Sequence, residues 1–225
     1  MANRTVIIAG ATGLVGRELL RGLLADPTVQ QVHVVGRRTP PVASPKLTAH
    51  VVDFTALPPL PPADELYLAL GTTIKVAGSQ AAFRAIDHHA NLAVAKAALA
   101  SGTKRTGLVS AMGADATSSV FYSRVKGELE AELSALPFTG LVIARPSLLV
   151  GSRAELGQPS RPGEEWGNTL NNILGFLIPA NYKPMKAADV AHALLSSVPS
   201  AIGIKVLSRA RCAGDPRRGS CASSV

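Results

Sequence analysis

Short apolar runs alternate with longer amphipathic segments along most of the chain. Seven runs have the length of a strand: residues 5–9, 31–35, 50–54, 65–70, 106–110, 141–144 and 202–207. Between them, apolar positions recur at helical spacing over residues 14–25, 80–100, 120–136 and 187–197. Strands that are apolar along their whole length are typical of parallel sheets covered on both faces. The pattern therefore predicts an α/β fold, a doubly wound parallel sheet of the Rossmann type with about seven strands, which binds ligands at the carboxyl ends of its strands.

Three stretches depart from this alternation. Residues 57–63 hold four prolines and predict a stiff surface connection. Residues 151–185 are rich in glycine, proline and asparagine, and we expect a small C-terminal cap segment there that shapes a substrate pocket. Residues 208–225 lack periodicity and predict a disordered basic tail. We therefore predict one domain over residues 1–207, cap included, followed by the tail.

Composition and charge restrict the class of function. Hydrophobic residues make up 47% of the 225 residues and charged ones 17%, which is typical of a globular protein. The net charge is +8, but four arginines and one aspartate in the tail supply +3 of it, and only 4% of residues are aromatic. We therefore expect no nucleic-acid partner.

The sequence also bears on location and on metal binding. It has no signal peptide and no apolar run of about 18 residues, so we expect a cytoplasmic protein that does not enter the membrane. Both cysteines lie in the tail, and the adjacent His88 and His89 have no second pair of ligands at metal spacing. We expect no metal site.

A glycine-rich turn follows the first predicted strand. It reads Gly10-Ala11-Thr12-Gly13-Leu14-Val15-Gly16, with G-x-x-G-x-x-G spacing, and leads into a helix. Glycines at these positions permit unusual dihedral angles, the close approach of a pyrophosphate and tight packing of helix on strand, while the helix N-terminus offers N–H groups to phosphates. The turn therefore predicts a dinucleotide site.

The ends of the next two predicted strands bear on which dinucleotide is bound. An NAD enzyme commonly places an acid after its second strand, but this chain reads Val35-Gly36-Arg37-Arg38. A guanidinium can bond a 2′-phosphate, so NADP(H) is favoured and NAD(H) is still possible; the alternative is two solvated arginines. Asp53 and Phe54 close the third predicted strand, where a carboxylate can accept from the adenine amino group and a ring can pack on the base.

Tyr122 and Lys126 are four residues apart in a predicted helix, so they share one face. An ammonium near a phenol lowers the pKa of tyrosine from its usual value of about 10, which makes Tyr122 a candidate acid or base. Ser110, at the end of the fifth predicted strand, could bond the same substrate oxygen. The Y-x-x-x-K spacing also occurs on exposed helices of no catalytic role, but the glycine turn and Ser110 favour catalysis.

Four segments carry a resemblance to a known family. They are Leu70-Gly71-Thr72-Thr73, Ser110-Ala111-Met112-Gly113-Ala114, Phe121-Tyr122-Ser123-Arg124-Val125-Lys126-Gly127-Glu128 and Ala144-Arg145-Pro146-Ser147. Over residues 5–207 the sequence resembles an atypical short-chain dehydrogenase/reductase of the Tat-interacting-protein-like oxidoreductase branch.

The resemblance implies roles for individual residues. Those that would hold the pyrophosphate are Gly10, Thr12, Gly13, Leu14, Val15 and Gly16. Those that would contact the rest of the cofactor are Arg37 at the 2′-phosphate, Asp53 and Phe54 at the adenine, Leu70, Gly71 and Thr72 at the nicotinamide ribose, and Pro146 beside the nicotinamide. Ser110 would orient a carbonyl, Tyr122 would protonate it, and Lys126 would lower the tyrosine pKa and bond the ribose.

The sequence departs from the family in two places. The asparagine of the family's catalytic tetrad has no direct match, because the corresponding helix reads Asp87-His88-His89-Ala90-Asn91. The tail after Leu207 matches nothing in the family. The first departure leaves the proton relay open.

These observations favour an NADPH-dependent reductase of a small or medium carbonyl compound. One alternative is an NADPH-binding sensor or scaffold with a protein partner and little turnover. A weaker alternative is a sugar-nucleotide epimerase or dehydratase, since the chain after the sixth predicted strand is short for a nucleotide-sugar lobe. Substrate identity and oligomeric state are left open.

Overall fold

The computed structural model describes residues 3–147, 149–150 and 185–208. The predicted cap and tail lie outside the described residues, apart from Met185 and Ser208.

The described chain forms one large parallel sheet of seven strands, in the order β3-β2-β1-β4-β5-β6-β9. The strands are β1 (Arg4–Ala9), β2 (Val29–Gly36), β3 (Leu47–Val51), β4 (Glu65–Leu68), β5 (Arg105–Val109), β6 (Gly140–Ala144) and β9 (Gly203–Leu207). A second, two-stranded sheet pairs β7 (Leu149–Val150) with β8 (Met185–Lys186). The predicted doubly wound α/β fold is confirmed.

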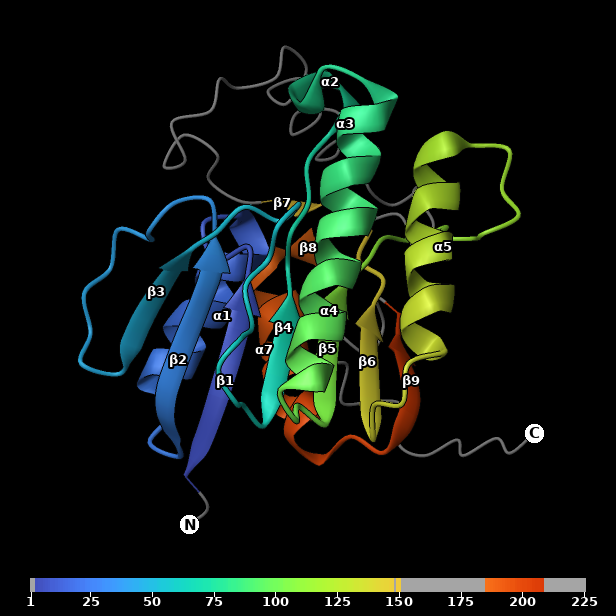
Figure 1. Cartoon of the computed structure of the whole chain (residues 1–225). Helices are drawn as coiled ribbons and strands as arrows, with labels where there is room; N and C mark the ends of the chain where they lie inside the picture. The colour runs from blue at the N-terminus through green and yellow to red at the C-terminus, as the bar shows by residue number, and fades with distance from the viewer. Residues whose placement is uncertain (1–2, 148, 151–184, 209–225) are drawn as a thin grey trace, which may run out of the picture.

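Helices cover both faces of the large sheet (Figure 1). On one face lie α1 (Leu14–Ala25) and α7 (Ala187–Ser197), and on the other α4 (Asn91–Ala100) and α5 (Phe121–Ser134). The shorter elements are α2 (Ile74–Ala77), α3 (Gln80–Arg84), the π-helical turn η1 (Ala85–Ala90) and the 3-10 turn η4 (Val198–Ser200). Within the described ranges, no helix is long and apolar enough to cross a membrane.

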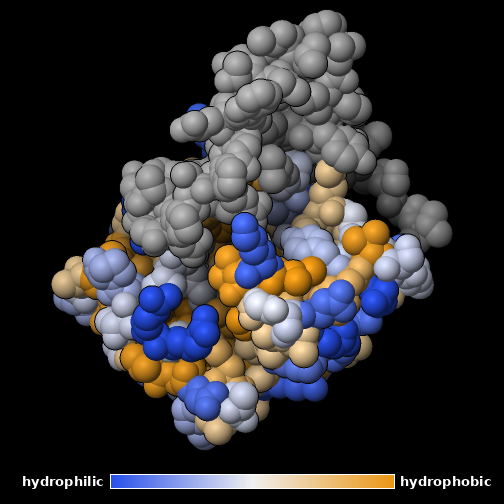
Figure 2. Space-filling view, turned by 90° about the horizontal axis from the view of Figure 1, so that it is seen from above, coloured by the Kyte–Doolittle hydropathy of each residue, from blue (hydrophilic) through white to orange (hydrophobic). Residues whose placement is uncertain are grey.

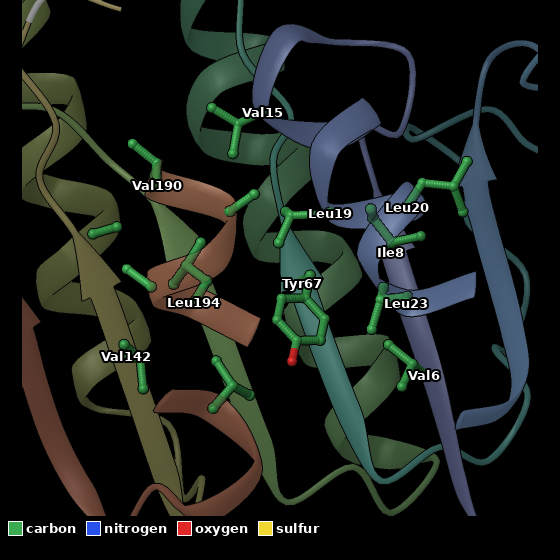
Figure 3. Close-up of a cluster of buried hydrophobic side chains, with 14 of the residues drawn as sticks. Val6, Ile8, Val15, Leu19, Leu20, Leu23, Tyr67, Val142, Val190 and Leu194 are labelled. Atoms are coloured by element: carbon green, nitrogen blue, oxygen red, sulfur yellow. The ribbon is translucent and has the colours of Figure 1, made fainter. Parts of the chain in front are cut away.

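The core lies in two layers, because successive strand residues point to opposite faces of the sheet. Val6 and Ile8 of β1 pack toward α1 and α7, while Ile7 and Ala9 pack toward α4 and α5. Figure 3 shows the first layer. Its labelled members are Val6, Ile8, Val15, Leu19, Leu20, Leu23, Tyr67, Val142, Val190 and Leu194.

The third strand corrects a sequence prediction. We expected residues 50–54, but β3 is Leu47–Val51, in a register that pairs Gly36 with Val51. Asp53 lies beyond the strand end, where its carboxylate accepts from the backbone N–H and the hydroxyl of Thr55 at 2.9 and 2.8 Å. This local turn competes with the strand ladder and ends the strand.

Candidate functional site

The sheet order places the topological switch point of the sheet between β1 and β4. From β1 the chain continues through β2 and β3 on one side, and from β4 through β5 and β6 on the other. Open α/β sheets bind ligands at such a point, outside the carboxyl ends of the strands. Figure 2 views the molecule from this edge, where strongly hydrophilic and hydrophobic side chains lie next to one another.

Two glycines of the turn after β1 are required by the fold. Gly10 has φ of +89°, and a Cβ there would lie 2.4 Å from the backbone of Ala69. A Cβ on Gly16 would lie 2.0 Å from the carbonyl oxygen of Gly10. These glycines allow β1, α1 and the end of β4 to come into contact.

Gly13 differs from them. Its φ of −79° suits any residue, and a Cβ would meet the Gly10 carbonyl oxygen at an ordinary distance of 3.4 Å. Gly13 is the residue before α1 and provides no side-chain cap to the helix. The N–H groups of Leu14, Val15 and Gly16 have no acceptor within α1, because they belong to its first turn, and a helix start of this kind suits an anion. A glycine that the fold does not require, at the start of a helix, fits the backbone approach of a pyrophosphate.

The predicted adenine-side residues follow β2 and β3. Arg37 and Arg38 are exposed and come directly after β2. Asp53 is also exposed, and the hydrogen bonds from Thr55 hold its pKa below the ordinary value. Phe54 is half-buried and packs against the core layer on the α4 side. Arg37 and Asp53 therefore belong to the same edge of the sheet as the glycine turn.

Tyr122 and Lys126 lie on α5, as the spacing predicted. Tyr122 is 37% exposed, and its ring centroid lies 5.5 Å from that of Phe83. Lys126 is buried, and its Nζ lies 2.7 Å from Oδ1 of Asp87. The turn after β4 reaches the same place, since a Cβ on Gly71 would lie 4.0 Å from Lys126 Nζ.

Asp87 and Asn91 join the predicted ribose-binding turn to the helices. Oδ2 of Asp87 accepts from the backbone N–H of Thr72 at 2.8 Å, and Nδ2 of Asn91 donates to the carbonyl of Leu70 at 3.1 Å. Burial raises the pKa of Asp87, although Lys126 and Thr72 act against the rise. The structure thus brings Lys126 together with residues 70–72, and the acid that joins them was not predicted from the sequence.

Ser110 has a different partner from the predicted one. It is buried, and its hydroxyl donates to Oε1 of Glu130. Arg145 binds the same carboxylate through Nε, at 3.1 Å from both oxygens, and through a terminal nitrogen at 2.5 Å. Along α5, Glu130 lies one helical turn after Lys126, and Tyr122 lies one turn before it. To bond a substrate carbonyl, the Ser110 hydroxyl must therefore turn away from Glu130.

Pro146 and the two adjacent histidines complete the list of predicted positions. Pro146 follows β6, is buried, and accepts a hydrogen bond from the backbone N–H of Met112 at 2.8 Å. His88 faces Glu132 of α5 at 3.0 Å, and burial lowers its pKa. Among the residues that the structure describes, no group of three or more His, Cys, Asp or Glu side chains could hold a metal ion.

Comparison with known proteins gives the family. No family model matches the sequence. A protein of Emericella nidulans is 41% identical over 185 residues, covering 78% of this chain and 77% of the relative. A protein of Candida albicans is 35% identical over 200 residues, covering 83% and 84%. Both are called Fmp52, mitochondrial.

The chain belongs to the Fmp52 family. The names of these Fmp52 relatives overturn the expected cytoplasmic location, which was wrong. That expectation depended on a search for a secretory signal, which is only one of several targeting devices. The names carry no information about a reaction.

Solved structures share the Rossmann fold of this Fmp52 chain. MoeE5 in complex with UDP-glucose and NAD has a TM-score of 0.66 at 16% identity, covering 91% of this chain and 76% of that protein. The oxidoreductase ylbE from Lactococcus lactis has a TM-score of 0.61 at 18% identity, covering 90% and 89%. The fold is therefore one that holds NAD in other proteins.

Proposed function

We propose that this chain is an NADP(H)-dependent oxidoreductase of the short-chain dehydrogenase/reductase type, in the Tat-interacting-protein-like branch, which reduces a small or medium carbonyl compound in mitochondria. One observation carries the proposal. Lys126 is buried against the turn after β4, at the switch point of the sheet, and Tyr122 lies one helical turn away on the same face of α5. The mitochondrial setting comes from the names of the relatives.

The residues at this edge of the sheet offer groups suited to each part of the cofactor. The first turn of α1 would hold the pyrophosphate, Arg37 the 2′-phosphate, and Asp53 and Phe54 the adenine. Residues 70–72 and Lys126 would hold the nicotinamide ribose, with Pro146 beside the nicotinamide. When bound, NADPH supplies a hydride.

The chain's own residues would supply the proton and the alignment. The phenol of Tyr122 would donate its proton to the carbonyl oxygen, and its partial exposure leaves it accessible to a substrate. Lys126 would present a positive charge next to that phenol. The Ser110 hydroxyl would orient the carbonyl once it had turned from Glu130.

One observation favours a second candidate function, an NADPH-binding sensor or scaffold that acts through a protein partner. Lys126 is paired with Asp87, and Ser110 with Glu130, so two of the three proposed catalytic groups already have protein partners. A panel of carbonyl compounds tested with purified protein and NADPH, followed by cofactor absorbance, separates the two candidates. A reductase consumes NADPH with at least one compound, whereas a sensor binds NADPH and consumes none.

Replacing Arg37 should remove most of a preference for NADPH over NADH. A charge-assisted bidentate contact contributes about 1.5–3 kcal/mol, so Arg37→Ala should weaken NADPH binding about ten- to a hundredfold and leave NADH binding nearly unchanged. Calorimetric titration of both cofactors measures the two affinities. Arg38→Ala is the matched control, and equal affinities of the parent for NADPH and NADH would refute the preference.

Two glycine substitutions should separate cofactor binding from folding. A Cβ on Gly13 would make only ordinary van der Waals contacts, so Gly13→Ala should keep the melting temperature within a few degrees. The added methyl group should nevertheless weaken NADPH binding by about tenfold or more. Gly16→Ala should lower the melting temperature markedly, since its Cβ would overlap the Gly10 carbonyl. If Gly13→Ala bound NADPH as tightly as the parent, the pyrophosphate would not lie at α1.

A further inference from the structure

Three side-chain pairs join the α3–η1 segment to α5. Two are ion pairs, Arg84 with Glu128 at 2.6 Å and Asp87 with Lys126 at 2.7 Å. In the third, His88 contacts Glu132 at 3.0 Å, and burial lowers the pKa of this imidazole. Each of the other two pairs has a partner that is at least a quarter exposed, but the side chains of Asp87 and Lys126 are only 1% and 6% exposed. A pair so deeply buried is costly to desolvate and is weak evidence for a stabilising role. The buried position of the Asp87–Lys126 pair therefore needs an explanation other than stability.

Asp87 contacts two separate parts of the site at once. Its Oδ1 faces Lys126 Nζ, and its Oδ2 accepts from the Thr72 N–H at 2.8 Å. The backbone of Asp87 belongs to the π-helical turn η1, whose Asp87 carbonyl accepts from Nδ2 of Asn91 at 3.0 Å. The same Nδ2 reaches the Leu70 carbonyl. Single π-helical turns occur frequently at functional sites, and this one aims a carboxylate between α5 and the turn after β4.

The other acids along α5 are engaged elsewhere. Glu128 pairs with Arg84, Glu132 with His88, and Glu130 with Arg145 and Ser110. The other ionisable groups on these elements are the phenol of Tyr122 and the guanidinium of Arg124 on α5 and the imidazole of His89 on η1. The Arg124 guanidinium donates to the backbone carbonyl of Ser118 at 2.8 Å. Asp87 is therefore the carboxylate paired with Lys126 in the described part of the chain.

We propose that Asp87 is the positioning residue of this site, which holds the Lys126 ammonium against residues 70–72 and keeps it charged, ready to bond the hydroxyls of a cofactor ribose. The inference depends on the proposed function, because it assigns Lys126 to the ribose. The inference also concerns the asparagine of the family's catalytic tetrad, which has no direct match in this sequence. Within the segment 87–91, the side chain that contacts Lys126 is that of Asp87. The side chain of Asn91 donates instead to the backbone carbonyls of Leu70 and Asp87.

Asp87→Asn removes the negative charge of the Asp87 side chain while keeping its size and shape. The amide can still accept from Thr72 N–H, but Lys126 loses its counter-charge. We expect the dissociation constant for NADPH to rise about tenfold or more at neutral pH. We also expect binding to decline with rising pH at a lower pH than in the parent, since a buried ammonium without its carboxylate loses its proton more readily. Fluorescence titration of NADPH across a pH series measures both effects.

Glu128→Gln is the matched control. It breaks the neighbouring ion pair between the same two segments without touching Lys126, so NADPH affinity and its pH profile should match those of the parent. Asp87→Glu provides a second variant, independent of whether Asp87→Asn folds. It keeps the carboxylate and should retain the parent's pH profile even if the affinity falls.

The outcomes are distinguishable. If the parent binds neither NADPH nor NADH, the proposed function fails, and this inference fails with it. If the parent binds NADPH and Asp87→Asn binds it equally at every pH, only the role of Asp87 is overturned. If Asp87→Asn and Glu128→Gln weaken binding equally with unchanged pH profiles, Asp87 merely clamps the two segments together, and the positioning role is also overturned. An Asp87→Glu variant with a displaced pH profile would overturn it as well.

Discussion

Tyr122→Phe should lower the turnover of carbonyl reduction by about 10²–10⁴, the usual loss when an acid or base is removed. Its affinity for NADPH should stay within about twofold of the parent, because the lost hydroxyl is assigned to the substrate and not to the cofactor. The ring keeps its place beside Phe83, 5.5 Å away between centroids, so the first turn of α5 should stay intact. The measurement is the rate of NADPH consumption at matched cofactor saturation.

Phe121→Leu is the control for this experiment. Phe121 also lies in the first turn of α5 and packs its ring near Phe83, 5.9 Å between centroids, but it carries no ionisable group. Its replacement should change turnover far less than Tyr122→Phe does. If the parent and Tyr122→Phe reduce a carbonyl compound at the same rate, Tyr122 is not the acid. If neither reduces any compound while NADPH binds tightly, the sensor function should replace the reductase.

The sequence predicted the helices and strands best where the apolar period was unambiguous. The bounds of α1 and α7 agree with the expected ranges, because apolar residues recur at helical spacing up to each end. It failed at β3, because the apolar residues Val52 and Phe54 follow Val51 and suggest a strand that continues to residue 54. Pairing with β2 and the Asp53 turn decide where that strand ends, and both depend on contacts across the sheet. The single helix expected over residues 80–100 contains the π-helical turn η1, for which the pattern gives no sign.

In the candidate site, too, local sequence patterns locate some residues, whereas others depend on tertiary contacts. The strand-end rule placed the glycine turn and Ser110 at one edge of the sheet, and the turn after β4, which the family resemblance had named, follows a strand of the same sheet. Helical spacing correctly put Tyr122 and Lys126 on one face of α5, and the same spacing applied once more reaches Glu130, which we had not considered. Asp87 could not be found in this way. Its meeting with Lys126 depends on how α5 packs against η1, which is a tertiary contact without a signature in local sequence.

Lys126→Met should lower the free energy of unfolding by about 3–5 kcal/mol, the cost of leaving one buried charge without its partner. Asp87 would then be a buried carboxylate with only the Thr72 N–H as a partner. The loss should shrink in acid. Burial already raises the folded-state pKa of Asp87 above its unfolded value, so its protonated form favours the folded state at low pH, and that contribution is lost as the pH rises. Urea unfolding of parent and variant at acidic and neutral pH measures the difference.

The double variant Lys126→Met with Asp87→Asn removes both charges and separates stability from function. Replacing a buried ion pair with hydrophobic groups of similar volume is often neutral or stabilising. Asp87→Asn keeps the acceptor for the Thr72 N–H but buries an amide NH2, so the double variant should recover most, though not all, of the stability that Lys126→Met loses. It should nevertheless bind NADPH poorly, because the ammonium assigned to the ribose is gone. A double-mutant cycle over the four proteins gives the coupling between the two residues directly. If the double variant were as unstable as Lys126→Met alone, the ion pair would be needed for the stability of the fold. If stability recovered but NADPH binding did not, the ion pair would serve cofactor binding.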